Sequence, residues 1–76
     1  MNKTYERVVE DMRLMEELTS IRVQQRVSQY ELAARMDTKQ PAIVYMERGQ
    51  RDPQLSTILR YAQSLGKRIT WIIEDA

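Results

Sequence analysis

Apolar side chains recur every three or four residues over most of the chain, which is the spacing of one face of an α-helix. No glycine or proline interrupts the stretch from Thr4 to about Arg26. The pattern predicts one long helix here, or two helices with a break near Thr19–Ser20. We expect its apolar positions to lie in the core: Tyr5, Val8, Met12 and Met15, then Leu14, Leu18 and Ile21 as the stripe moves around the axis.

Residues 28–31, SQYE, have the form of a capping box at the start of a second helix. In this motif the Ser28 hydroxyl accepts from the backbone N–H of Glu31, and the Glu31 side chain bonds back to Ser28. The helix that follows contains the apolar positions Leu32, Ala33, Ala34 and Met36.

A turn at Asp37-Thr38 leads into a third helix and is expected to supply its N-terminal cap. Pro41 fits the first turn, where N–H groups have no intrahelical partner. It biases the residue before it away from helical dihedrals, so the start can shift by a residue or two. Gly49 is expected to end this helix in a left-handed conformation.

A fourth helix is predicted after residue 51, with Asp52 as its N-cap and Pro53 as its first residue. Gly66 stops the run. The apolar positions repeat at helix spacing: Leu55, Ile58, Leu59, Ala62 and Leu65.

The pattern leaves the type of the last segment, 67–75, open. It is rich in β-branched and aromatic residues, which favours a short strand with Ile69, Trp71 and Ile73 on one face. The alternative is a short helix in which residues 71–73 pack as one turn. We therefore expect an all-α fold: one small helical bundle over residues 1–76, with a helical extension at 1–18, two helices in 28–49 and a C-terminal strand for dimerisation.

Composition excludes several classes of function. The 76 residues include no Cys and no His, which removes disulfides and the commonest metal ligands and general base. With no Gly-rich phosphate loop and no carboxylate pair in an evident cleft, we expect no enzyme, no cofactor and no metal site. No apolar run has the length of a membrane span, and MNKTYERVVED is not a signal peptide, so a cytoplasmic protein is expected. A domain this small gains stability by pairing with itself.

The net charge of +1 hides an uneven distribution. Residues 1–18 carry a net −2, residues 19–51 carry +3, and residues 52–76 are balanced. The basic middle segment indicates a nucleic-acid partner.

The predicted third helix has apolar residues on two faces. At helical spacing Ile43 and Met46 lie about 60° apart on one side. The opposite side collects Pro41, Val44, Tyr45 and Arg48, with Gln40 at its margin. An outward valine and tyrosine require a partner, which can be a ligand, the N-terminal helix or another chain.

The stretch SQYELAARMDTKQPAIVYMERG resembles the helix-turn-helix core of the phage-repressor (Cro/cI-type, XRE) family. The resemblance continues through RDPQLSTILRYAQSLG and covers roughly residues 20–66. The chain departs from the family pattern at Asp37 and Arg26, where the family often has glycine; Asp tolerates a positive φ. The matching positions are Gln29, Leu32, Ala33, Ile43, Met46, Glu47, Arg51 and Pro53.

The resemblance implies a lambda-repressor-like fold that binds double-stranded DNA with the outer face of residues 39–48. It assigns Gln40 and Tyr45 to base reading, and Gln29 and Arg51 to positioning on backbone phosphates. Val44 could pack on a thymine methyl group. The resemblance also implies a pair between Arg22 and Glu47 that holds the recognition helix. The candidate DNA contacts are Gln29, Lys39, Gln40, Pro41, Val44, Tyr45, Arg48 and Arg51.

The function expected from the resemblance is a dimeric (auto)repressor that reads a palindromic operator, with a dimer interface at Ile69, Trp71 and Ile73. The layout of a helix-turn-helix followed by a short strand also resembles antitoxins of the HigA and HipB type. One alternative is therefore an antitoxin whose acidic N-terminal region binds a basic toxin. Another is a controller of a restriction-modification system.

Overall fold

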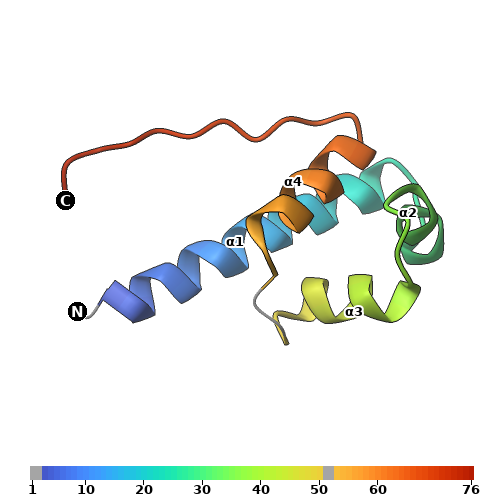
Figure 1. Cartoon of the computed structure of the whole chain (residues 1–76), viewed down its shortest axis with the longest axis horizontal. Helices are drawn as coiled ribbons and strands as arrows, with labels where there is room; N and C mark the ends of the chain where they lie inside the picture. The colour runs from blue at the N-terminus through green and yellow to red at the C-terminus, as the bar shows by residue number, and fades with distance from the viewer. Residues whose placement is uncertain (1–2, 51–52) are drawn as a thin grey trace.

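Four α-helices make up the regular structure of the residues that this computed structural model describes, 3–50 and 53–76 (Figure 1). They are α1 (Lys3–Gln24), α2 (Gln29–Arg35), α3 (Gln40–Arg48) and α4 (Leu55–Ser64). The expected all-α class is confirmed. None of these helices combines the length and the apolar character that crossing a bilayer requires.

The first helix, α1, is continuous through Thr19–Ser20, so of the two alternatives that the pattern left open, the one long helix is the one that forms. Its second half packs against the other three helices, and its first half extends beyond them (Figure 1). Met15 and Leu18 are buried as expected, while Leu14 and Ile21 are half-buried at the edge of the core. Three further positions of the predicted stripe have side chains outside the described part of the chain: Tyr5, Val8 and Met12.

The helix starts follow the predicted caps only in part. Ser28 caps α2 by accepting from the backbone N–H of Glu31 at 3.0 Å. Glu31 does not bond back to Ser28 in the described structure, because its carboxylate pairs with Arg35 one turn later, at 3.4 Å. The capping box is therefore half formed.

The predicted caps of the next two helices are wrong or lie outside the described residues. The N-cap of α3 is Lys39, without a side-chain hydrogen bond, because the turn before it serves α2 instead: the Thr38 N–H bonds to Ala33 O at 2.9 Å. The helix α4 begins two residues after Pro53, with Gln54 as its N-cap. The proposed cap Asp52 lies outside the described residues.

The core is formed by one side chain cluster from all four helices and the loop between α1 and α2. Within it the two inward positions of α3 behave as predicted, since Ile43 and Met46 are buried. Leu55, at the first residue of α4, is exposed, because it lies at the edge of the bundle. The buried apolar residues are Met15, Leu18, Val27, Leu32, Ala33, Met36, Ile43, Met46, Tyr61, Ala62 and Leu65.

The segment 67–76 contains neither a helix nor a strand, so the predicted strand at 67–75 is absent from this single chain. A strand is stabilised by hydrogen bonds to a neighbour, and the described part of the chain has no other strand to pair with it. The segment is extended and runs back in the direction of the first half of α1 (Figure 1). Ile69 packs against the core, whereas Trp71 and Ile73 are exposed.

Candidate nucleic-acid interface

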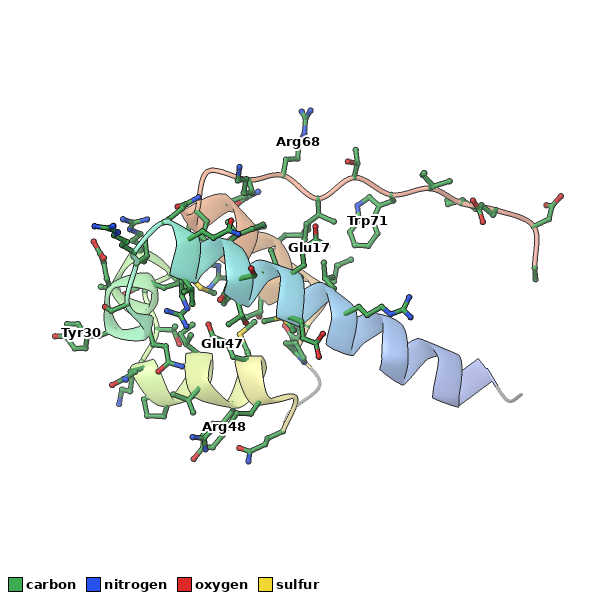
Figure 2. The ribbon with its side chains drawn as sticks, turned by 180° about the vertical axis from the view of Figure 1, so that it is seen from behind. Glu17, Tyr30, Glu47, Arg48, Arg68 and Trp71 are labelled. Atoms are coloured by element: carbon green, nitrogen blue, oxygen red, sulfur yellow. The ribbon has the colours of Figure 1, made fainter. Side chains whose placement is uncertain are left out.

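The outer face of α3 carries the side chains that the sequence assigned to DNA. Pro41 and Tyr45 are exposed, and Val44 is half-buried. Figure 2 shows Arg48 on the side of α3 that points away from α1, opposite Glu47. The described helices therefore leave Tyr45 and Arg48 accessible rather than covered by α1.

Polar side chains flank this face at both ends. Lys39 and Gln40, at the start of α3, are exposed. Gly49 ends the helix with φ 69°, as predicted, and directs the chain away after Arg48. The predicted phosphate contact Arg51 lies outside the described residues. Within the described part, the structure brings Lys39, Gln40 and Arg48 onto one helix with the outward apolar residues.

Glu47 holds α3 from its inner side. The predicted pair with Arg22 is confirmed: Arg22 Nε lies 2.7 Å from Glu47 Oε2, and Arg22 Nη2 lies 3.0 Å from Glu47 Oε1. The remaining guanidinium nitrogen, Nη1, donates to the carbonyl oxygen of Val27 at 2.8 Å. Both side chains are nearly buried, with exposed fractions of 11% for Arg22 and 7% for Glu47. A bidentate pair of this kind fixes geometry as well as charge.

Two further donors reach the same carboxylate. Gln29 Nε2 donates to Glu47 Oε1 at 3.0 Å, and the Tyr61 hydroxyl donates to Glu47 Oε2 at 2.5 Å. The sequence assigned Gln29 to a phosphate and did not indicate this contact, in which one of its amide N–H groups binds Glu47. An amide nitrogen has two N–H groups, so the other can still meet a phosphate at the start of α2.

These contacts define the protonation states of the cluster. Burial by itself would raise the pKa of Glu47, but hydrogen bonds from Arg22, Tyr61 and Gln29 outweigh it and lower the pKa below its ordinary 4.5. The hydrogen bond to Glu47 raises the pKa of Arg22 despite the cost of burial. Burial, and then the bond to Glu47, raise the pKa of Tyr61. The carboxylate is therefore ionised and the phenol protonated at neutral pH.

Tyr61 was not identified from the sequence as part of the site. Its position gave a usable signal, because residue 61 lies three after Ile58 and four before Leu65 on the apolar face of α4. A tyrosine at a core position requires a hydrogen-bond partner for its hydroxyl. The identity of that partner depends on how α4 packs, which local spacing does not specify.

Comparison with known proteins identifies relatives for nearly the whole chain. Residues 18–72 match the family described as Helix-turn-helix. The chain is 38% identical to the antitoxin HigA1 of Mycobacterium tuberculosis over 71 residues, which cover 93% of this chain and 48% of that protein. It is 40% identical to an uncharacterized HTH-type transcriptional regulator of Haemophilus influenzae over 57 residues, 75% of this chain and 58% of that protein. The chain thus spans about half the length of these curated relatives. No solved structure gives a significant match.

Proposed function

Because this chain belongs to the XRE-type helix-turn-helix family of DNA-binding regulators, we propose that it is a dimeric (auto)repressor that reads a palindromic operator with α3. The observation that carries this proposal is the two-sided construction of α3. Its inner side is fastened to the bundle through Glu47, and its outer side is accessible. A helix held rigidly in this way can present the same atoms to the major groove at every encounter.

The roles of the outward side chains follow from their chemistry. Gln40 pairs with an adenine edge, Val44 packs on a thymine methyl group, and Tyr45 contacts a methyl group or a phosphate. Charged and polar residues around them, Lys39, Arg48, Gln29 and Arg51, bind bases at the margin or backbone phosphates. Pro41 lies in the first turn of α3 and is exposed beside these side chains.

A single helix-turn-helix reads only a few base pairs, so operator recognition requires two copies. We place the contact between copies at the C-terminal segment, where Ile69, Trp71 and Ile73 would lie on one face of a strand. Pairing with the same segment of a second copy would supply the hydrogen-bond neighbour that the single chain lacks.

The experiment that tests this proposal is selection of bound duplexes from a randomised DNA pool at about 150 mM salt, a concentration at which purely electrostatic binding is weakened. We expect a palindrome whose half-sites lie about one helical turn, ~34 Å, apart. An unenriched pool would reject sequence-specific DNA reading and leave the outer face of α3 as a protein contact.

A second candidate function, neutralisation of a toxin, is favoured by the similarity to the antitoxin HigA1 over 93% of this chain. It does not exclude DNA binding. The test is co-expression with the product of the neighbouring gene: an antitoxin would restore growth and copurify with that product. If the chain neither restores growth nor copurifies with that product, toxin neutralisation is rejected and the proposal of DNA binding is unaffected.

A further inference from the structure

Glu47 is held from three directions at once. Arg22 binds it from α1, Gln29 from the start of α2, and Tyr61 from α4. The donors are divided evenly between the two carboxylate oxygens, since Oε1 accepts from Arg22 and Gln29 and Oε2 accepts from Arg22 and Tyr61. A carboxylate tied to one helix can pivot about that contact, whereas one tied to three helices has a single orientation.

The contribution of Tyr61 is separable from charge neutralisation. Arg22 already pairs with both oxygens of Glu47, so the negative charge is compensated without the phenol. The ring of Tyr61 has no exposed surface, and a phenylalanine would fill the same space. What the hydroxyl adds is a directional hydrogen bond from α4 to the Glu47 carboxylate of α3, beyond the apolar core that side chains of both helices share.

This link matters because α4 leads directly into the segment 67–76. In a dimer formed through that segment, the path from the interface to the DNA-reading face runs along α4 and across to α3. We infer that Tyr61 is a positioning residue for DNA reading, whose hydroxyl fixes α3 relative to α4 and thereby sets the spacing of the two half-sites. This inference rests on the proposed dimeric, DNA-reading function.

The test compares Tyr61→Phe with the wild type on three duplexes. One carries the selected operator, and the other two carry the same half-sites with the centre shortened or lengthened by one base pair. One base pair changes the separation by about 3.4 Å and rotates one half-site by roughly 35°. The matched control is Tyr30→Phe, which removes the same hydroxyl from a side chain that is 74% exposed and points outward from α2 (Figure 2).

We expect the wild type and Tyr30→Phe to discriminate strongly between the three spacings. Tyr61→Phe should lose roughly tenfold of the discrimination between spacings, the equivalent of one hydrogen bond to a charged group, and should lose less affinity than this for an isolated half-site. Equal discrimination by Tyr61→Phe and the wild type overturns the inference. So does a uniform loss of binding to all duplexes that matches the unfolded fraction, because it indicates a purely structural role.

A measurement without DNA separates this inference from the proposed function. Amide hydrogen exchange should accelerate in α3 of Tyr61→Phe more than in α1, because α3 has lost one of its attachments. Equal changes in the two helices overturn the role of Tyr61 even if the operator is found. A wild type without any spacing preference instead rejects the dimeric function, and with it the spacing role, whatever the exchange data show.

Discussion

At the scale of single residues, the organising group is the carboxylate of Glu47. A buried carboxylate is costly unless it is paired and its lone pairs are filled. Here four hydrogen bonds from Arg22, Gln29 and Tyr61 meet that requirement, and they lower the pKa of Glu47 below its ordinary value. The same contacts orient α3, so in the proposed function both stability and DNA reading depend on the Glu47 side chain.

Glu47→Ala should lower the free energy of unfolding at pH 7 by about 3–5 kcal/mol, because it leaves the buried Arg22 uncompensated. Because the folded-state pKa of Glu47 is depressed, its stabilisation is complete above the ordinary value of 4.5 and is lost as the pH falls through the folded-state pKa. The difference in the free energy of unfolding between the wild type and Glu47→Ala should therefore become smaller at acidic pH. Urea denaturation at several pH values measures this.

The control for this prediction is Glu31→Ala, which breaks an exposed pair with Arg35 four residues away. Its effect should stay below about 0.5 kcal/mol. If Glu47→Ala and Glu31→Ala lower stability equally, the contacts of Glu47 do not stabilise the fold.

At the scale of elements, the turns determine how the helices meet. Arg26 and Asp37 have φ values of 60° and 53°, in the left-handed region that favours glycine. These are the two positions at which the chain departs from the family pattern. Their backbone conformation shows that the turns keep their geometry and accept a local strain. Side chains then fasten the ends of the helices, as where Gln25 Nε2 donates to Leu65 O at 2.9 Å.

Arg26→Gly should raise the free energy of unfolding by about 0.5–1 kcal/mol, because relief of the left-handed strain exceeds the added entropy of the unfolded chain. Gly49→Ala, the reverse kind of change, should lower the free energy of unfolding by about 0.5–1 kcal/mol, because the strain is offset in part by the smaller entropy of the unfolded chain. A Cβ at Gly49 would meet no atom within 4 Å, so only the φ of 69° opposes it. Thermal and urea unfolding measure both. A stabilising Gly49→Ala would contradict the strain argument.

A second prediction at this scale concerns Gln40, at the margin of the outer face of α3. If Gln40 makes the proposed bidentate contact with an adenine edge, Gln40→Ala should reduce discrimination against a changed base in the selected operator by about 1–3 kcal/mol. Its stability should change by less than about 0.5 kcal/mol, because Gln40 is exposed. Fluorescence anisotropy with matched and mismatched duplexes tests this. Gln63→Ala, on the exposed side of α4, is the control and should bind like the wild type.

At the scale of the whole molecule, the segment 67–76 leaves large apolar side chains exposed and has no regular secondary structure. Ile72 and Ile73 are 84% and 98% exposed, and Trp71 points from the extended segment toward α1 while remaining 57% exposed (Figure 2). Adjacent large apolar side chains on an unpaired extended segment are typical of an interaction site. A second copy of the same segment would complete it.

In the proposed dimer, Ile73→Lys should weaken the association of the two copies at least tenfold, because each copy would place a charge at a contact worth about 1.5–3 kcal/mol when apolar. Ile72→Lys is the control. In a strand its side chain faces away from Trp71 and Ile73, so this variant should still dimerise. Sedimentation equilibrium measures both. If both variants dissociate to the same extent, the segment does not pair as a strand with alternating faces.

The sequence by itself determined the elements that depend on local spacing. The apolar period predicted helical structure in the four regions where the helices lie, and the predicted inward positions of α3, Ile43 and Met46, are buried. The hydroxyl of Ser28 and the absence of a side chain at Gly49 fixed two helix ends, because each acts on backbone groups within a few residues.

Only the tertiary structure decided the contacts made across the bundle. Tyr61 and Gln29 lie 14 and 18 residues from Glu47 along the chain, and no local period encodes their meeting. The packing also showed that Thr38 closes α2 rather than capping α3. The conformation of the segment 67–76 likewise depends on contacts with a distant partner, and in a single chain the segment is extended without being a strand. A strand requires hydrogen bonds from a neighbour, and helix–helix packing within this bundle provides none.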